Sequence, residues 1–566
     1  MTTRILFAGA AFALGVTLLV APAGAAPKST SPGASSSSAA AAAAFAAAPI
    51  EWGKCKDKFL RDANAQCGMF TVPLDHANPA GPTIRLAVSR VKHRGPKYRG
   101  VMLTNPGGPG GSGTFMAAYG QFVPGKVAST YDWIGMDPRG VGESKPALTC
   151  DKRILKINTR PPYDPTSDAI LNAWVDRSEE YAADCAASDA AELLPHLKTT
   201  DNVADFEMLR ETLGVEQVSF YGYSYGTYIA QVYATLHPDR LDKLVLDGVV
   251  DPRDVWYAAN VAQNDGFEKS IMRFFRWAAR GHADLRLGRT GAQVEKTYYR
   301  VLRRLTREPV NQVGPEELAD VTLGAGYARF LYPEVAAALS EIANDGTAKQ
   351  ARGIYTSLNP VVPGGDNGYA MYLATICTDA PWPTDLSLLL ADNELQDRRS
   401  PFFTWANGWF NGPCRTWTAP PAAPVEIATY ARPALLINET FDAATPIDGA
   451  YEVRRRFTEA VLIEGINGTT HSGSLSGVAC VDNRIAKYLA TGKLPNRRSG
   501  DRSDVRCSPV PAPPTGRPDE VEERPAISAR PTFVAGPERV PDSVDLAPEL
   551  TRDHLGNPSR GLLAPL

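Results

Sequence analysis

Short apolar segments of strand length alternate with longer amphipathic segments through most of the chain. Longer segments such as residues 200–214 repeat apolar side chains at helical spacing. Alternating strands and helices predict an α/β fold, a mainly parallel sheet covered by helices on both faces. The strand-like runs, apolar and rich in β-branched or aromatic residues, are residues 84–91, 100–108, 131–140, 218–224, 241–248, 433–440 and 460–465.

The alternation stops over residues 252–423. This span is rich in aromatic side chains and contains helical patterns such as residues 267–280 and 332–343, separated by irregular stretches. Because strand-like segments resume after it, we expect a mostly helical lid, or cap, inserted between two strands of one sheet. The predicted core is therefore divided into residues 50–251 and 424–507.

The two ends of the chain differ from its middle. Residues 1–26 place an arginine before an apolar stretch that ends in small residues, which is typical of an export signal peptide. Residues 27–49 form a Ser/Ala-rich segment that predicts a flexible linker. In residues 508–566 proline and charge replace apolar periodicity, which predicts a disordered tail. No other segment approaches the ~18 apolar residues of a membrane span, so we expect no membrane insertion after signal cleavage.

Composition narrows the class of partner. With 566 residues, of which 44% are hydrophobic and 21% charged, the chain can form a large core and an additional module. The formal net charge of -3 gives no basic surplus that would favour nucleic acid. We therefore expect a small or peptidic partner.

Eight cysteines form an even set in a chain that carries an export signal. None lies in a CxxC or Cys/His ligand pattern, so disulfides are the simplest interpretation, and we expect neither a metal nor a cofactor. Pairing of neighbours along the chain would close four local loops. Those pairs would be Cys55 with Cys67, Cys150 with Cys185, Cys377 with Cys414, and Cys480 with Cys507.

The stretch "FYGYSYGTYIA", residues 220–230, places Ser224 between two glycines at a junction of strand and helix. An isolated G-x-S-x-G can be a chance turn. Here the flanking elements favour a nucleophile elbow, the sharp turn that exposes a reactive serine hydroxyl. Such a turn brings backbone segments close together and leaves no room for a Cβ at Gly222 and Gly226.

A serine hydroxyl needs a base, and histidine is the usual base near neutral pH. The chain order serine, acid, histidine leaves four candidates. His237 lies at the end of the helix that follows Ser224 and is better explained as a helix cap, His282 lies in the lid, and His554 lies in the tail. His471 follows the last strand, where a loop can return to the sheet edge, and is the predicted base.

The third member of a triad is a carboxylate that orients the imidazole. Asp442 follows the strand-like run 433–440 at its carboxyl end, where α/β sheets place their sites, and is the predicted acid. Asp448 is an alternative, although we expect it in the following helix. Asp247, at the end of another strand, is a second alternative.

Acyl transfer also needs two N–H donors that face the developing oxyanion. The amide of Tyr225, directly after the nucleophile, is one predicted donor. The second is expected in the glycine-rich loop 104–113, with Gly108 as the candidate. An ordinary glycine turn or a phosphate loop is the alternative, but no G-K-[ST] follows the glycines.

Taken together, these motifs resemble the α/β-hydrolase fold and, within it, the secreted bacterial tripeptidyl aminopeptidases related to proline iminopeptidases. The resemblance rests on "NPGGPGGSG", "DPRGVGES", "GYSYGTY", "VLDGVVDP", "FDAATP" and the His471 loop followed by Cys480. It implies cleavage of short peptides from a free N-terminus, with Ser224, Asp442 and His471 as the triad. Pro106 departs from the histidine that often precedes the glycines in related peptidases, and "NGTTHSG" lacks the usual glycine just before His471.

We therefore expect a secreted or cell-wall-associated serine exopeptidase that releases short peptides, in particular tripeptides. A carboxylesterase or lipase-like hydrolase is the nearest alternative, and a catalytically idle binding module is a third. A buried substrate ammonium would need an acidic partner, for which Glu143, Asp265 and Asp379 are candidates. Four tryptophans could line apolar subsites or form the core of the lid: Trp256, Trp382, Trp405 and Trp409.

Overall fold

The computed structural model describes residue 45 and residues 47–253 and 255–515. The predicted signal peptide, most of the predicted linker and the predicted tail beyond residue 515 lie outside the described residues. Within the described ranges, every helix is too short or too polar to cross a lipid bilayer.

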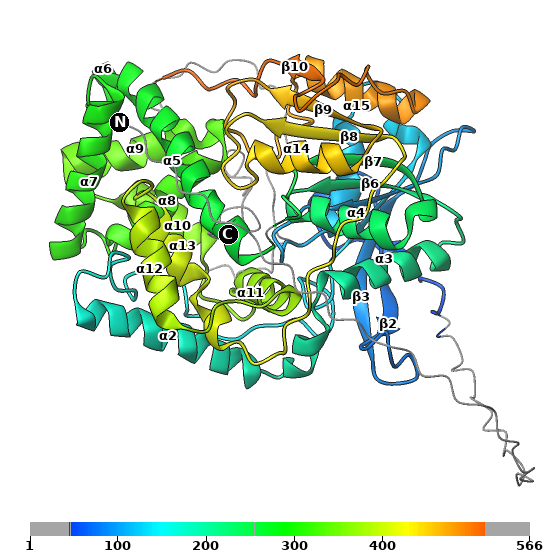
Figure 1. Cartoon of the computed structure of the whole chain (residues 1–566), viewed down its shortest axis with the longest axis horizontal. Coiled ribbons are helices and arrows are strands. Elements are labelled where there is room, and N and C mark those ends of the chain that lie inside the picture. The colour runs from blue at the N-terminus through cyan, green and yellow to red at the C-terminus, as the bar shows by residue number, and fades with distance from the viewer. Residues whose placement is uncertain (1–44, 46, 254, 516–566) are drawn as a thin grey trace, which may run out of the picture. The chain divides into compact units, whose positions relative to one another are not determined.

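Ten strands of the described residues form one sheet, in the order β1-β2-β3-β5-β4-β6-β7-β8-β9-β10 (Figure 1). β1, β2 and β3 pair antiparallel with their neighbours, and all pairs from β5 to β10 are parallel. The mainly parallel sheet confirms the predicted α/β fold. The strands are β1 (Gly53–Lys54), β2 (Gln66–Pro73), β3 (Thr83–Val91), β4 (Val101–Asn105), β5 (Asp132–Met136), β6 (Val218–Tyr223), β7 (Leu241–Asp247), β8 (Ala434–Glu439), β9 (Ala460–Gly465) and β10 (Val505–Cys507).

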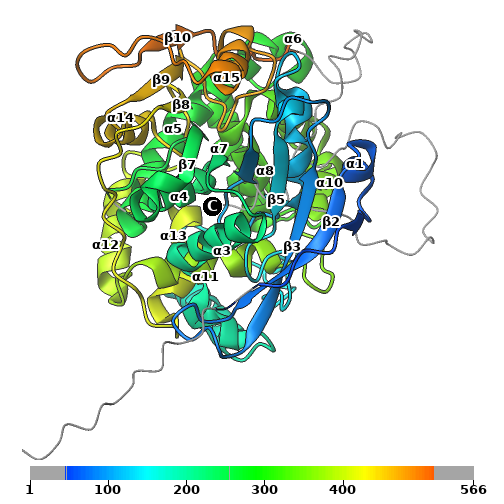
Figure 2. The same cartoon turned by 90° about the vertical axis from the view of Figure 1, so that its right-hand side faces the viewer.

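Helices cover both faces of the sheet, which explains why β4, β6, β8 and β9 are buried along their whole length (Figure 2). On one face α3, α4 and α14 share a core with β6 and β8. On the other face α15 and the 3₁₀ segment Thr114–Phe122 pack against β5, β6 and β7. The core helices are α1 (Lys58–Asp62), α3 (Thr199–Thr212), α4 (Tyr225–Leu236), α14 (Ile447–Arg456) and α15 (Ala479–Thr491).

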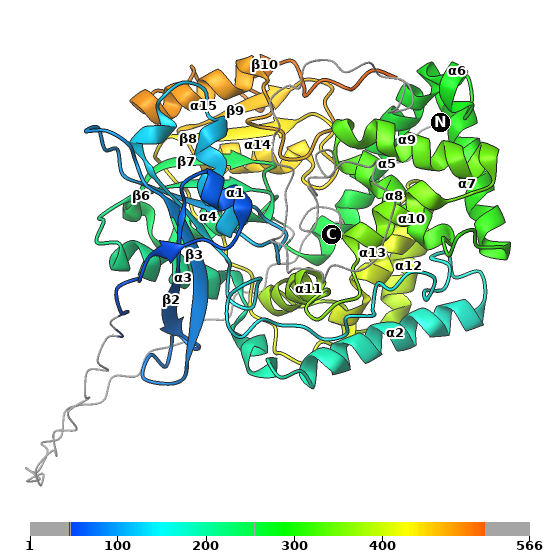
Figure 3. The same cartoon turned by 180° about the vertical axis from the view of Figure 1, so that it is seen from behind.

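A helical cap lies between β7 and β8 in the chain, where the sequence predicts an inserted lid. Helix α2 (Asp168–Ala186), which precedes it in sequence, packs alongside the cap, and Trp174 stacks on Trp409 at a centroid distance of 5.8 Å (Figures 1 and 3). The cap helices are α5 (Tyr257–Arg280), α6 (His282–Leu285), α7 (Gly291–Arg307), α8 (Pro315–Tyr327), α9 (Tyr332–Ser340), α10 (Lys349–Leu358), α11 (Asn367–Asp379), α12 (Leu386–Asp397) and α13 (Thr404–Phe410).

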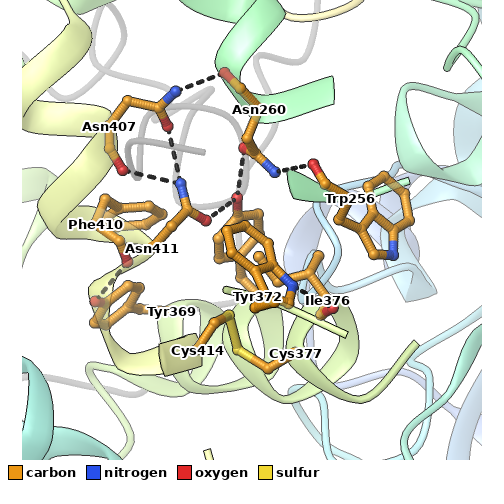
Figure 4. The surroundings of a disulfide bond; sticks show 11 residues. Trp256, Asn260, Tyr369, Tyr372, Ile376, Cys377, Asn407, Phe410, Asn411 and Cys414 are labelled. Atoms are coloured by element: carbon orange, nitrogen blue, oxygen red, sulfur yellow. Dashed lines mark hydrogen bonds between the residues drawn. A yellow bond between two sulfur atoms is a disulfide. The ribbon is translucent and has the colours of Figure 1, made fainter. Parts of the chain in front are cut away.

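A buried polar network joins three helices of the cap beside the Cys377–Cys414 disulfide (Figure 4). The Tyr372 hydroxyl lies 3.1 and 2.8 Å from the side-chain oxygens of Asn260 and Asn411 and can donate its one proton to either of them. Asn407 in turn donates to the backbone oxygen of Asn260 at 2.7 Å. Because these amides find partners inside the cap, the network fixes the relative positions of α5, α11 and α13.

All eight cysteines are paired, and each pairs with its neighbour along the chain, as predicted. Three of the disulfides lie outside the cap, and one of them, Cys480–Cys507, links α15 to β10. Disulfides of this kind persist in oxidising compartments, so they agree with an extracellular protein.

Residues 508–515, which composition assigns to the predicted tail, contact the folded part of the chain. Val510 is buried, and its N–H donates to the Glu439 carboxylate at 2.6 Å. The carbonyl of Pro513 accepts from the Trp277 indole N–H at 2.9 Å. In Figure 1 this segment continues from β10 toward cap helix α6.

Candidate active site

Ser224 occupies the sharp turn between β6 and α4. Its backbone has φ 52° and ψ −124°, a conformation that a residue with a Cβ adopts only where its surroundings enforce it. The Ser224 N–H donates to the Asp247 carbonyl at 2.9 Å, and the Ser224 carbonyl accepts from Thr227 N–H at 2.8 Å. The turn predicted for a nucleophile elbow is therefore present and held at both of its peptide groups.

Close backbone contacts explain why the motif has glycine at both positions, as the sequence suggests. A Cβ on Gly222 would lie 2.4 Å from the Gly226 carbonyl oxygen. A Cβ on Gly226 would lie 2.6 Å from the Asn105 carbonyl oxygen. Both distances are shorter than real Cβ contacts, so the elbow admits no larger residue at either position without moving its neighbours.

Asp442 and His471 meet at the carboxyl ends of β8 and β9. His471 Nδ1 lies 2.8 and 2.9 Å from the two carboxylate oxygens of Asp442, and both side chains are buried. Thr445 also donates to Asp442, through its N–H at 3.0 Å and its hydroxyl at 2.9 Å. An Nδ1–H that donates to Asp442 leaves Nε2 as the basic nitrogen, the tautomer required of a general base.

The imidazole lies against Gly248, the residue after the one whose backbone carbonyl accepts the Ser224 N–H. A Cβ on Gly248 would be 2.9 Å from His471 Cε1, and the preceding residue, Asp247, accepts the Ser224 N–H. His471 Nε2 is buried and has no hydrogen-bond partner within the described part of the chain. Hydrogen bonds between nucleophile and base are often long before substrate binds.

Neither alternative acid makes a hydrogen bond to the imidazole among the described residues. The Asp247 carboxylate accepts the Ser474 N–H at 2.7 Å, and burial raises its pKa to about 7. Asp448 is exposed in the first turn of α14. Of the three carboxylates considered from the sequence, Asp442 is therefore the one that the structure brings to His471.

The other histidines lie away from this site. His237 is the C-cap residue of α4, as predicted, and its ring packs on Tyr233. His282 begins the short cap helix α6. His554 lies outside the described residues.

The glycine-rich loop touches the elbow through Gly107. A Cβ there would lie 2.7 Å from Ser224 Cβ and 3.0 Å from the Tyr225 nitrogen. The Gly107 N–H donates to the Asn105 side chain at 2.9 Å, which leaves the next amide, that of Gly108. Neither the Gly108 nor the Tyr225 N–H has a hydrogen-bond partner among the described residues, so both are available to an oxyanion.

Asp137 holds the glycine-rich loop in place, a role that its motif "DPRGVGES" did not reveal. One carboxylate oxygen accepts from the Ser112 hydroxyl at 2.7 Å and from the N–H groups of Gly113 and Thr114 at 2.8 and 2.9 Å. Burial raises the pKa of Asp137, and these donors oppose that shift by favouring the ionised form. The carboxylate thereby fixes the loop that carries Gly108.

The three candidate acids for a substrate ammonium differ in their contacts. Asp265 already accepts from Gln396 and Ser400. Glu143 is exposed, and its side chain has no hydrogen-bond partner among the described residues.

Asp379 is buried where the cap meets the core near Ser224. It accepts from Thr199, through the N–H at 2.6 Å and the hydroxyl at 2.5 Å, and from the Trp256 indole at 3.0 Å. Burial raises its pKa to about 6. The Thr199 hydroxyl also lies 2.8 Å from the Tyr225 hydroxyl, so this cap residue is linked to the residue after the nucleophile.

Of the four tryptophans considered from the sequence, one lies next to the elbow and the other three pack within the cap. Trp256 packs on Tyr225 with ring centroids 5.8 Å apart, next to the elbow. Trp405 and Trp409 instead stack on one another within a cluster that includes Trp174. Trp382 packs edge-on against Tyr257 on the cap.

The cap also contacts the loop that carries the imidazole, a feature that sequence reasoning missed. The His471 N–H donates to the Tyr327 carbonyl, at the end of α8, at 2.8 Å, and the two rings lie 5.9 Å apart. Gln263 of α5 donates to the Ala444 carbonyl at 2.9 Å, close to Asp442. No local pattern signals such contacts, because they join elements that are distant in the sequence.

Known proteins match most of the length of this chain. It is 35% identical to the tripeptidyl aminopeptidase of Streptomyces lividans over 485 residues, which cover 83% of this chain and 88% of that protein. It is 27% identical to serine protease Hip1 of Mycobacterium tuberculosis over 473 residues, covering 79% and 90% of the two chains. It is also 27% identical to carboxylesterase B of the same species over 494 residues, covering 81% and 90%.

A family model described as "TAP-like protein" matches residues 400–507, the segment that contains Asp442 and His471. The match to the Streptomyces protein, at 35% identity, covers 83% of this chain and 88% of that protein. The chain therefore belongs to the tripeptidyl aminopeptidase family within the α/β-hydrolases.

Proposed function

We propose that the protein is a secreted serine exopeptidase that releases short peptides, in particular tripeptides, from substrates with a free N-terminus. The observation that carries this proposal is the buried Asp442–His471 pair beside the strained turn of Ser224. The relationship to tripeptidyl aminopeptidases supports the choice of peptide substrates.

The proposed reaction starts with attack of Ser224 Oγ on the carbonyl carbon of the scissile peptide bond. His471 Nε2 accepts the hydroxyl proton, while Asp442 stabilises the imidazolium through Nδ1–H. The amides of Tyr225 and Gly108 donate to the oxyanion of the tetrahedral intermediate. When the C–N bond breaks, His471 returns the proton to the leaving amine and an acyl-enzyme remains.

Water completes the cycle in the second half of the reaction. His471 deprotonates the water as it attacks the ester carbonyl, a second oxyanion forms at the same amides, and the proton then returns to Ser224 Oγ as the peptide leaves. Each half-reaction uses the same three side chains and the same two N–H donors. Apart from the peptide substrate and one water molecule, no group outside the chain is needed to balance either step.

The nucleophile is tested with a fluorophosphonate probe on the wild-type protein and on Ser224→Ala. We expect covalent labelling of the wild type and none of the variant, because the variant lacks the attacking oxygen. Persistent labelling of the variant would contradict the assignment of Ser224.

A carboxylesterase is the second candidate, because one relative carries that name. The same triad serves both reactions, so only substrates separate them. Free and N-acetylated tripeptide anilides should be compared with short acyl esters. Cleavage that requires the free amine supports the exopeptidase, whereas a strong preference for esters with no amine requirement supports the carboxylesterase.

A further inference from the structure

We propose that residues 508–513 form a strap that positions the loop of His471, and that Glu439 and Arg329 are the positioning residues that hold this strap. The proposal rests on the proposed function, since it assigns these groups a part in keeping His471 productive. It concerns the eight described residues that follow β10, which composition alone would place in a disordered tail.

The strap sequence, Ser-Pro-Val-Pro-Ala-Pro, is suited to an extended and stiff conformation. Each proline fixes its own φ and restricts the residue before it to extended geometry, so little conformational freedom is lost when the segment docks. Between Pro509 and Pro511, Val510 is the one residue with an N–H. That N–H donates to Glu439 Oε1 at 2.6 Å.

Val510 is held on both sides of its peptide and through its side chain. Its carbonyl accepts from Arg329 Nη1 at 3.2 Å, opposite the bond from its N–H to Glu439. A Cβ on Gly473, two residues after His471, would lie 2.9 Å from Val510 Cγ2. The strap therefore packs directly on the loop that carries the imidazole.

Glu439 joins the strap to the same loop through its second carboxylate oxygen. Oε2 accepts the N–H of Thr470, the residue before His471, at 2.6 Å. A Cβ on Gly468 would lie 2.1 Å from this oxygen, so the loop wraps closely around the carboxylate. Burial raises the pKa of Glu439 to about 7, while the N–H donors of Thr470 and Val510 favour its ionised form.

Arg329, from the cap, completes the arrangement. Its guanidinium donates to the Thr469 hydroxyl at 3.2 Å and to the carbonyl of Asn467, in addition to Val510. Beyond Val510, the strap reaches the cap a second time, where Pro513 accepts from the Trp277 indole. Cap, strap and core thus contact one another at Arg329, Val510 and Glu439, next to the loop that carries His471.

We expect loss of these contacts to lower the rate of the reaction and to leave the global fold in place. Within the described part of the chain the strap contacts Glu439, the His471 loop and the cap, and β10 with its Cys480–Cys507 disulfide precedes the strap in the chain. What the strap supports is the backbone on both sides of His471, at Thr470 and Gly473. Loss of that support should move the imidazole relative to Ser224 and leave substrate contacts elsewhere unchanged.

The test compares the full chain with two shortened chains. A chain that ends at Thr515 keeps the strap and is the control, and a chain that ends at Cys507 loses the strap but keeps β10 and its disulfide. We expect the control to match the full chain. We expect the shorter chain to lose about tenfold to a hundredfold in kcat and in fluorophosphonate labelling rate, with KM little changed.

Two substitutions keep the test decisive if the chain ending at Cys507 fails to fold. Glu439→Gln retains one acceptor oxygen but presents an NH₂ group to Thr470 or Val510, and Arg329→Gln removes the guanidinium. Arg280→Gln, at an exposed position of the same cap, is the matched control. We expect both test variants to lower kcat and the labelling rate and the control to leave them unchanged.

Hydrogen exchange across residues 466–474 provides a readout that needs no substrate. We expect faster exchange of this loop in the chain ending at Cys507 and in both test variants. Unchanged exchange together with unchanged labelling in every folded variant would overturn the strap proposal. Normal labelling without peptide cleavage in the full chain would instead refute the exopeptidase function and leave the strap to be judged by labelling and exchange.

Discussion

The steric fit of the elbow makes Gly222→Ala the most direct perturbation of the candidate site. The new Cβ would lie 2.4 Å from the Gly226 oxygen, 2.6 Å from the Gly226 carbonyl carbon and 3.0 Å from the Thr227 nitrogen. Gly222 has an ordinary strand φ, so the substitution acts through contact and not through backbone strain. All three atoms belong to the first turn of α4, so the first turn must move.

The size of the displacement follows from the contact distances. An unstrained contact needs roughly 3.2–3.5 Å, so the Gly226 peptide must move away by about 1 Å. Ser224 and the Tyr225 amide lie in the same turn and move with it. We expect destabilisation of about 1–3 kcal/mol from overpacking and a loss of about a hundredfold in the rate of fluorophosphonate labelling.

The assay measures the second-order labelling rate and the thermal unfolding temperature of each variant. Gly353→Ala is the matched control, because it lies inside helix α10 with no atom within 4 Å of the new Cβ. This control should label normally and gain about 0.5–1 kcal/mol of stability from improved helix propensity. If Gly222→Ala labels at a rate within about twofold of the wild type with unchanged stability, the steric reasoning for the elbow is refuted.

Three further predictions concern the carboxylates and the cap. Asp442→Asn removes the carboxylate that faces His471 Nδ1, so it should lower the labelling rate by about 10³-fold or more. Asp247→Asn should lower the labelling rate far less, because the Asp247 carboxylate accepts from the Ser474 N–H. Comparable losses in the two variants would contradict the assignment of the acid. Replacing Cys377 and Cys414 together by serine should cost about 2–4 kcal/mol in thermal unfolding while labelling persists in the folded protein. Burial raises the pKa of Asp379 to about 6, so the free energy of unfolding that this side chain contributes should fall as pH rises from about 4 to about 6. Asp379→Asn should therefore flatten the decline of the unfolding free energy over that range. An unchanged slope would show that the decline does not come from Asp379.

The sheet could be predicted from the sequence largely because its central strands are buried on both faces. Residues 434–437 and 460–463 are continuous apolar runs, and their short length between turn residues favours a buried strand over a helix. Strand β2 was not predicted, because polar residues, a glycine and a proline interrupt the apolar side chains of its sequence "QCGMFTVP". Its pairing with β3 comes from the neighbouring strand and not from its own pattern.

The candidate site was predictable to the extent that its chemistry is local. Ser224 is identified by glycine spacing, and Asp442 and His471 by their positions after strands in the expected order. Glu439 gave no such signal, because a glutamate at a strand end is usually solvated, and here its partners lie on a distant loop and on the strap. Composition could not predict the docking of the strap, because whether a proline-rich segment docks depends on the surface that it contacts.

The cap contacts the two parts of the proposed triad in different ways. The turn of Ser224 is formed by β6 and α4 of the core and touched by the glycine-rich loop, and the cap contacts it through the ring of Trp256 on Tyr225. The loops of Asp442 and His471 are also held by the cap, through Gln263 and the Tyr327 carbonyl. A movement of the cap that admits a substrate must therefore break or carry these two contacts. Cap position thus bears on the backbone of the loops that carry the acid and the base, and it reaches the elbow through the side chains of Trp256 and Asp379.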